Sequence, residues 1–307
     1  MLSYQHEFHA GNHADILKHQ VLVFILEHLK KKDKPFTVFD THAGAGRYLL
    51  DDERSRKTGE AGNGIQRLLG TGGLPARMDS YLALCRLYGE QRMYPGSPEI
   101  ERCMLREGDR LILSELHPAE IQVLQENMRQ PVLVPDQTAV HAAVHHRDGW
   151  EMLRALTPPQ IKRGLAVIDP SYEEGTDYTR TAETVADVRR KWPAGIIMVW
   201  YPLLHHRRGE TTAMKRSLKA AAQAGINQAD VLDIQLHISQ PGSHQETDLA
   251  SFKAQKAEGT NTPRLYGSGV FIINPPWQLA QDCEAVLPAV AAALSDQGSW
   301  SVSTSGL

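Results

Sequence analysis

The residues best suited to chemistry are Asp169, Pro170 and Tyr172, in the tetrapeptide Asp-Pro-Ser-Tyr at 169–172. They follow the apolar run 165–168, which predicts a buried parallel strand. A carboxylate, a turn and an aromatic ring are therefore presented at the carboxyl end of a strand. This is the edge at which open α/β sheets bind ligands. The combination favours holding a planar exocyclic amine for methylation.

The two acceptors of this tetrapeptide match the two N–H groups of such an amine. Asp169 can accept one, and the Pro170 carbonyl can accept the other, because proline keeps its acceptor although it lacks a donor. Together they would aim the nitrogen lone pair at a methyl donor, while Tyr172 would stack on the base. Orientation and charge-assisted hydrogen bonds would supply most of the rate. An ordinary turn, with Asp169 capping the next helix, fits the tetrapeptide alone equally well.

A second motif, Asn-Pro-Pro-Trp at 274–277, also follows an apolar strand and matches the general pattern of amine methyltransferase sites even better. Position in the chain separates the two motifs. The first follows the fourth predicted strand, and the second follows the last one. In the methyltransferase variant of the doubly wound sheet the last strand is antiparallel, so its end points away from the cofactor edge. We therefore expect Asp169, and not Asn274, to be catalytic.

The elements that must position these residues alternate between strands and helices, which predicts a largely parallel sheet covered on both faces. Strands are predicted at 35–39, 111–115, 142–146, 165–169, 196–200, 231–238 and 268–273, and helices at 14–31, 177–192 and 211–224. Residues 47–99 are too many for one crossover. We expect a small helical insertion at 51–94, and a core formed by residues 1–50 and 95–307. The polar stretch 240–263 predicts a long loop.

A glycine turn, Asp-Thr-His-Ala-Gly-Ala-Gly at 40–46, follows the first predicted strand. Gly44 and Gly46 would let a ligand approach the backbone closely, beside a helix N-terminus. A nicotinamide-binding turn is disfavoured, because Leu49 replaces the third glycine of that fingerprint. The acidic residue expected about twenty positions later, at the end of a second strand, is missing too.

Two carboxylates, Glu115 and Asp148, end the second and third predicted strands. Glu115 is placed to bind the ribose hydroxyls of an adenosine-containing cofactor, and Asp148 could face its adenine. The alternative is that each carboxylate merely caps the following helix. Their occurrence in the right order at two strand ends favours a cofactor site.

The N-terminal segment is rich in histidine. His9 and His13 could ligate zinc if they shared a helix turn. However, Gly11 and Asn12 between them predict a turn, and no carboxylate–histidine set of standard spacing occurs. We expect no metal site, and interpret this segment as one that folds over the bound cofactor.

Composition narrows the class of protein. The 307 residues are 41% hydrophobic and 22% charged, as in soluble globular proteins. No apolar run reaches the length of a membrane span, and residues 1–12 lack a signal-peptide core. Cys85, Cys103 and Cys283 are far apart, which argues against a disulfide framework and fits a reducing compartment. We expect a cytoplasmic protein with no membrane partner.

The net charge of −3 means that any binding of nucleic acid must depend on local clusters of positive charge. Candidate clusters are residues 30–34, 189–191 and 205–208. Each could equally be a solvated face, and the first lies at a predicted helix C-terminus, where cations are favourable in any case.

Several segments resemble the bacterial 23S ribosomal RNA adenine-N6 methyltransferase (RlmJ-type) family. The resemblance covers essentially the whole chain, in order. It is carried by Met-Leu-Ser-Tyr at 1–4, His-Ala-Gly-Asn-His-Ala-Asp-Ile-Leu-Lys-His at 9–19, Asp-Thr-His-Ala-Gly-Ala-Gly-Arg-Tyr at 40–48, Tyr-Pro-Gly-Ser-Pro at 94–98, Glu-Leu-His-Pro at 115–118 and Trp-Tyr-Pro at 200–202.

The resemblance implies a class I (Rossmann-like) S-adenosylmethionine-dependent methyltransferase fold. Its sheet would have seven mostly parallel strands with an antiparallel last strand, plus a small helical insertion. S-adenosylmethionine would be the methyl donor, and the substrate would be one adenosine of 23S rRNA, in free RNA or an early assembly state. No obligate protein partner is implied. One residue departs from the family pattern, because Ser171 replaces the second proline of Asp-Pro-Pro-Tyr.

The resemblance also implies roles for individual residues. Tyr4 would meet the substrate base, Lys18 would be a further contact at the active site, and Asp169 would accept the proton of the amine. The residues implied to contact or hold the cofactor are His19, His42, Ser97, Glu115, Asp148, Gly149 and Asp169, in addition to Gly44 of the glycine turn.

Three other functions fit parts of this pattern. The motif does not separate RNA from DNA adenine methylation. A nicotinamide-dependent oxidoreductase is disfavoured by the glycine turn and by the aromatic residue after Asp169 and Pro170. A non-catalytic RNA-binding or ribosome assembly factor is supported by Ser171 alone.

Overall fold

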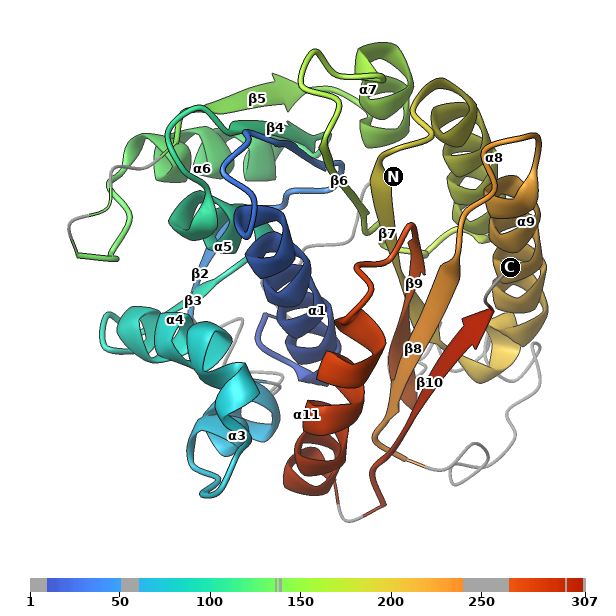
Figure 1. Ribbon diagram of the computed structural model, residues 1–307. Helices are drawn as coiled ribbons and strands as arrows, with labels where there is room; N and C mark the ends of the chain where they lie inside the picture. The colour runs from blue at the N-terminus through green and yellow to red at the C-terminus, as the bar shows by residue number, and fades with distance from the viewer. Residues whose placement is uncertain are drawn as a thin grey trace, which may run out of the picture.

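The computed structural model describes residues 10–50, 61–135, 137, 140–239, 265–295 and 297–305. A large mixed sheet forms the centre of the molecule, with helices packed against it (Figure 1). Its strands are β1 (Thr37–Asp40), β4 (Arg110–Glu115), β5 (Ala142–His146), β6 (Gly164–Ile168), β7 (Ile196–Leu203), β8 (Val231–His237), β9 (Gly267–Ile273) and β10 (Ser299–Ser305). The long helices are α1 (His13–Lys30), α4 (Asp79–Gly89), α5 (Ser97–Met104), α6 (Pro118–Arg129), α7 (Gly149–Leu156), α8 (Gly175–Lys191), α9 (Arg208–Gln223) and α11 (Leu279–Leu294).

The strand order in the large sheet is β10-β8-β9-β7-β6-β1-β4-β5. Five neighbouring strands, from β5 to β7, are parallel, whereas β9 is antiparallel to both β7 and β8. The predicted class I methyltransferase topology, with its reversed last core strand, is therefore confirmed.

The predicted number of seven strands was wrong, because the sheet has eight strands in the described part of the chain. The additional strand, β10, pairs antiparallel with β8 at the sheet edge. The segment Ser-Trp-Ser-Val-Ser-Thr-Ser offers only Trp300 and Val302 as alternating apolar residues. So short a period-2 pattern does not identify a strand until its partner is known.

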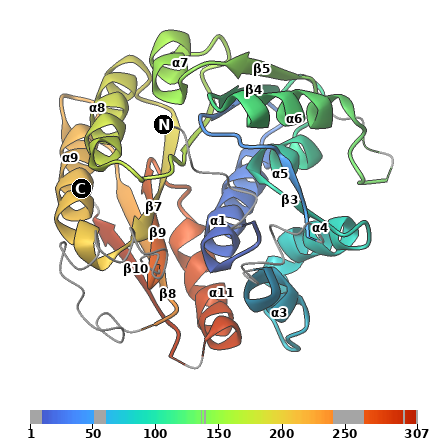
Figure 2. The same ribbon diagram turned by 180° about the vertical axis from the view of Figure 1, so that it is seen from behind.

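Both faces of the sheet are covered, as predicted (Figure 2). From β1 to β5 the strands are added toward one edge of the sheet, and from β6 onward they are added toward the other edge. Because the crossovers are right-handed, α5 and α6 lie on one face, and α7, α8 and α9 lie on the opposite face. Helix α1 contacts α5, α11 and β9, and so joins the first face. It packs its apolar residues inward, and the Asn12 side chain caps its first turn by accepting from the Ala14 and Asp15 amides.

The carboxyl ends of the parallel strands meet at one edge, as the topology requires. Asp169 directly follows β6 at this edge. Asn274 follows the reversed strand β9, and therefore lies at the opposite edge. Its backbone N–H donates to the Asp230 carbonyl, just ahead of β8, at 3.1 Å. The two proline motifs thus lie at opposite edges of one sheet.

A helical segment connects β2 (Arg47–Leu49) with β3 (Met93–Pro95), two strands that form a separate antiparallel pair. Its described part contains η2 (Gly62–Gln66), α3 (Arg67–Leu69), η3 (Ala76–Met78) and α4. The predicted apolar face of this segment is buried; its residues are Met78, Tyr81, Leu82, Cys85 and Tyr88. That residues 51–94 form a separate subdomain stays a prediction.

Several boundaries differ from those expected. Helix α8 begins at Gly175, two residues earlier than predicted, and β7 extends to Leu203. The N-terminal residues through His9 and the loop at 240–263 lie outside the described residues. In the described part of the chain, no helix is long and apolar enough to cross a membrane.

Candidate active site

A cavity of about 310 Å³ lies at the carboxyl edge of the parallel strands, which is a size typical of small-molecule sites. Most of the residues implicated from the sequence line it. They are Lys18, His19, His42, Gly44, Ser97, Glu115, Asp148, Gly149, Asp169 and Pro170. The fold therefore brings together side chains from α1, α5 and the ends of four strands. Tyr4 lies outside the described residues.

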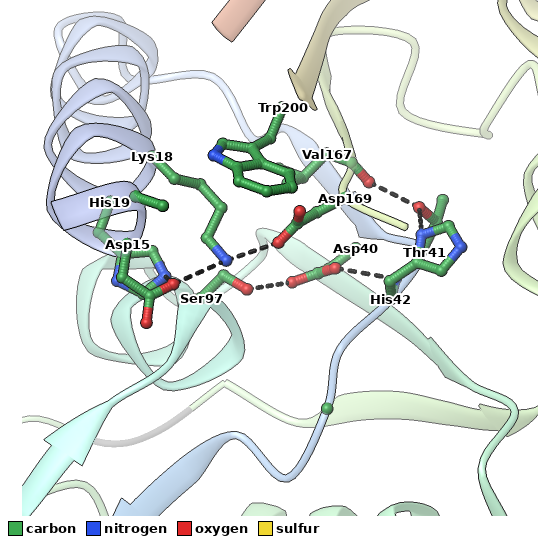
Figure 3. Close-up of polar contacts among 12 residues, drawn as sticks. Asp15, Lys18, His19, Asp40, Thr41, His42, Ser97, Val167, Asp169 and Trp200 are labelled. Carbon is green, nitrogen blue, oxygen red and sulfur yellow. Dashed lines mark hydrogen bonds and ion pairs between the residues drawn. The ribbon is translucent and has the colours of Figure 1, made fainter. Parts of the chain in front are cut away.

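Asp169 is paired with a buried cation (Figure 3). The Lys18 ammonium donates to Asp169 Oδ2 at 2.5 Å, and it lies 3.0 Å from Asp15 Oδ1. Burial alone would lower the pKa of Lys18, but the two carboxylates outweigh it and raise that pKa. Lys18 is thus a permanent cation that holds one oxygen of Asp169. The other oxygen, Oδ1, accepts no hydrogen bond from the described residues, and the side chain is 13% exposed.

Tyr172 does not occupy the position expected for it. Its ring is buried, is absent from the cavity lining and packs against Tyr178. Its hydroxyl donates to the Trp200 carbonyl at 2.9 Å, and its φ of +54° turns the chain sharply after Ser171. In this structure the side chain braces the loop that carries Asp169 and Pro170, and it would have to move before it could stack on a base in the cavity.

Glu115 is held rigidly at the cavity wall. Its Oε2 accepts from the Gly44 amide at 2.8 Å, and its Oε1 accepts from the His117 amide at 2.7 Å. The N-cap of α6 is His117, so the alternative that Glu115 caps this helix is wrong. Gly44 has a φ of +56°, and a Cβ there would lie 2.2 Å from Tyr48 Oη. The glycine turn therefore requires Gly44 for both reasons.

Asp148 has two partners. It caps α7 by accepting from the Glu151 amide at 3.0 Å, and its other oxygen accepts from Arg180 at 2.8 Å. Arg180 also lies over the Trp150 ring, 4.2 Å from the ring centroid, and it lines the cavity. No pattern in the sequence pointed to Arg180 or Trp150, because an arginine inside α8 and a tryptophan in α7 meet only when the two helices pack.

Asp40 and Ser97 form a hydrogen bond beside His42, at the start of the glycine turn (Figure 3). Ser97 donates its hydroxyl to Asp40 Oδ2 at 2.7 Å, and the His42 amide donates to Asp40 Oδ1 at 3.2 Å. Burial raises the pKa of Asp40 to about 6, against the stabilising bond from Ser97. These contacts join the end of β1 to the start of α5, and so fix the floor of the cavity.

The two histidines of the cavity, His19 and His42, differ in their surroundings. Burial lowers the pKa of His42 to about 4, and its ring stands edge-on to Trp150 with centroids 4.7 Å apart. His19 is fully buried, and its Nδ1 is 2.7 Å from the Tyr94 hydroxyl. Both histidines line the cavity, and His42 is the one whose ring contacts Trp150 of α7.

This donor set fits S-adenosylmethionine. The fixed Glu115 carboxylate suits a pair of ribose hydroxyls, and Asp148 suits the amino group of an adenine. His42 Nε2 is buried and has no hydrogen-bond partner in the described structure. A Cβ at Gly149 would lie 1.9 Å from the Thr41 carbonyl, so the backbone is packed tightly beside this position. Among the described residues, no group of three or more His, Cys, Asp or Glu side chains could hold a metal ion.

Comparison with known proteins shows the family of this chain. A family model described as "Ribosomal RNA large subunit methyltransferase D, RlmJ" matches residues 33–305. The chain is 40% identical to "Ribosomal RNA large subunit methyltransferase J" of Escherichia coli strain K12, over 94% of this chain and 92% of that protein. It is 37% identical to the Haemophilus influenzae protein of the same name, over 98% of each.

A solved structure is also similar over nearly the full length. The crystal structure of protein LPL1258 from Legionella pneumophila superposes with a TM-score of 0.79 at 29% identity, over 97% of this chain and 99% of that one. The family-model match, at residues 33–305, spans every strand of the large sheet from β1 to β10. The chain belongs to the family of ribosomal RNA large subunit methyltransferases.

Proposed function

We propose that this protein transfers the methyl group of S-adenosylmethionine to the N6 amine of one adenosine in 23S rRNA. Its substrate is free or early-assembly RNA in the cytoplasm. The observation that carries this proposal is the arrangement of Asp169. Its carboxylate lies at the cavity wall, next to Pro170 in the chain and in the lining, with one oxygen held by Lys18 and the other open to a donor.

The residues of the chain orient the amine and take up its proton. Asp169 Oδ1 accepts one N–H of the amine, and the Pro170 carbonyl accepts the other. Bound S-adenosylmethionine supplies an electrophilic methyl group. As the nitrogen gains a fourth bond it becomes acidic, and Asp169 accepts the proton that it loses. Lys18 keeps the carboxylate in place throughout, so little reorganisation is needed during the reaction.

The cofactor-holding residues are part of the same proposal. Glu115 receives the ribose hydroxyls, while Asp148 and His42 face the adenine. Gly44 and Gly149 line the cavity, and their missing Cβ atoms leave room for Tyr48 and for the Thr41 carbonyl. Ser97 acts through Asp40 at the floor of the cavity. The target base must leave its stack to reach Asp169. We propose Tyr4 as a contact of that base, on the family resemblance alone.

A methyl-transfer assay tests the proposal. The protein is incubated with methyl-labelled S-adenosylmethionine and four acceptors: deproteinised large-subunit RNA from cells that lack the gene, the same RNA from wild-type cells, mature large subunits, and duplex DNA. The Asp169→Ala variant is run in parallel. We expect label in N6-methyladenosine of the first RNA only, and its loss in the variant.

The other outcomes are equally informative. Label in duplex DNA at a comparable rate would make this a DNA methyltransferase. Label in mature subunits would contradict the preference for free or early-assembly RNA. Tight RNA binding without label, in protein that binds the cofactor, would support an assembly factor and would direct attention to Ser171.

A further inference from the structure

The segment after β7 concentrates positive charge. It comprises η4 (His205–Arg207) and α9, and it contains five Lys or Arg residues against one Glu, in a chain whose total charge is −3. Arg207 pairs with Glu210, and Lys215 pairs with Asp233 of β8, so the excess positive charge comes from Arg208, Arg216 and Lys219. Arg208 and His205 are exposed. Local excess of this kind in an acidic protein indicates a surface for an anion such as a nucleic-acid backbone.

This basic segment lies at the edge of the sheet that carries the cavity. Strand β7 is parallel to β6, so η4 begins at the same edge as Asp169. Arg207 makes the connection direct, because its guanidinium donates to the Glu173 carbonyl at 3.4 Å and pairs with Glu210 at 2.9 Å. Glu173 itself lines the cavity. The basic segment therefore adjoins the loop that follows the catalytic tetrapeptide.

A row of aromatic rings accompanies the positive charge. The His205 and Tyr266 ring centroids are 5.0 Å apart, and those of Tyr266 and His237 are 6.0 Å apart. These residues come from the end of β8 and the start of β9, which meet η4 at this edge. Tyr266 is buried, whereas His205 is exposed. Exposed rings beside cations are the features with which proteins bind unstacked bases of single-stranded RNA.

The other two basic clusters lie elsewhere. Residues 30–34 lead into the amino end of β1, and residues 189–191 precede the amino end of β7, so both lie at the opposite edge of the sheet. In the first cluster, Arg106 donates to the carbonyls of Lys30, Lys32 and Lys34. In the second, Arg189 donates to backbone carbonyls. The guanidinium groups of Arg106 and Arg189 therefore stabilise the backbone of the fold.

The cavity rim has the opposite charge. Glu173, Glu174 and Asp177 all line the cavity. Phosphates are repelled from such a rim, whereas a neutral base can enter. An acidic rim next to a basic segment therefore favours a neutral base inside the cavity and the phosphate backbone outside it, at the basic segment.

We propose that η4 and the first turn of α9 form the docking surface for the single-stranded RNA next to the target adenosine. Arg208 contacts a phosphate, and a base neighbouring the target stacks on His205. This inference rests on the proposed rRNA methylation and specifies how the same site engages its substrate.

Charge reversal of Arg208 tests the phosphate contact. Arg208 is the first residue of α9, where a glutamate is favourable for the helix dipole, so Arg208→Glu should fold. We expect its KM for deproteinised RNA to rise about tenfold or more, with kcat and cofactor affinity within about twofold of wild type. The salt dependence of kcat/KM should weaken by about one unit of slope. Lys32→Glu and Arg190→Glu are matched controls at the opposite edge, and should leave the KM unchanged.

The stacking contact has its own pair of variants. His205→Ala should raise the KM for RNA about fivefold or more, because a stacked base contributes about 1–3 kcal/mol, and His205→Phe should restore it. If Arg208→Glu behaves like the controls, or if Lys32→Glu or Arg190→Glu weakens RNA binding more, the docking surface is wrong. If wild-type protein labels no RNA at all, the proposed function has failed instead.

Discussion

The two proline motifs of this chain differ in almost every structural respect, although both follow buried strands. Asp169 faces a cavity and is paired with Lys18. The Asn274 amide donates to the Pro193 and Gly195 carbonyls at 2.9 and 2.7 Å, so its hydrogen-bonding capacity is used by the fold. Trp277 is 75% exposed and is not among the residues that line the cavity.

Strand direction causes the difference. A motif at the end of a parallel strand opens onto the shared carboxyl edge, where turns from β1, β4 and β5 contribute further side chains. A motif at the end of the reversed strand lies at the amino edge of the parallel strands, beside the loops that lead into those strands. A closer match to a sequence pattern therefore means less than the direction of the strand that precedes it.

The largest expected effect belongs to Asp169. Asp169→Ala removes the acceptor of the amine proton, and kcat should fall about 10³-fold or more. Cofactor binding, measured by calorimetry, should persist. Asp177→Ala is the matched control, because it removes another carboxylate of the cavity lining. Abolished activity in folded Asn274→Ala, with Asp169→Ala active, would reverse the assignment of the two motifs.

Lys18 should rank second. Lys18→Met keeps the length of the side chain but removes the cation, so Asp169 loses its fixed position and kcat should fall about 10- to 100-fold. The cofactor Kd should change much less. Lys30→Met, at the exposed end of the same helix, is the control. Wild-type turnover in folded Lys18→Met would show that Asp169 needs no partner.

Asn274→Ala should affect stability and not catalysis. The change removes two hydrogen bonds to backbone carbonyls, which should cost about 1–3 kcal/mol of unfolding free energy. Thermal denaturation would measure this loss, and turnover well below the melting temperature should stay at the wild-type level. An unchanged melting temperature would mean that the amide contacts contribute nothing.

The pH dependence of stability should also differ between the cavity edge, which carries His42, and the opposite edge, which carries Asn274. The pKa of His42 is lowered to about 4 in the folded protein, so its contribution to stability is present above its unfolded pKa of 6.5 and is lost as pH falls toward 4. His42→Gln should flatten the fall in melting temperature over this range. Asn274→Ala should leave the pH dependence as in wild type, because an amide has no proton to gain. Identical pH profiles of the melting temperature for His42→Gln and wild type would show that His42 does not cause this loss of stability.

The smallest effect is expected for Ser171→Pro. Both acceptors of the amine survive in the present tetrapeptide, so kcat should change less than about twofold. A proline reduces the freedom of the unfolded chain, which would stabilise the protein by about 0.4–1 kcal/mol if the turn accepts it. A large gain in kcat would instead show that Ser171 loosens the catalytic turn.

Much of the fold followed from local patterns. Buried apolar runs located seven strands, and their alternation with helices gave the parallel sheet, because a strand covered on both faces needs apolar residues throughout. The pattern of β10 was too short to be recognised. The expected Asp169, Glu115 and glycine-turn residues came together at one edge, since parallel strands place their carboxyl ends side by side.

The sequence by itself determined which residues lie at the ends of strands, and therefore that Asp169, Glu115 and Asp148 share an edge. The tertiary structure alone decided what surrounds them. Lys18 reaches Asp169 across 151 positions, Tyr172 turns inward to Trp200, and Arg180 packs over Trp150. The physical reason is that strand ends are set by local hydrophobic periodicity. The partners of a side chain depend instead on how helices distant in sequence pack against the sheet.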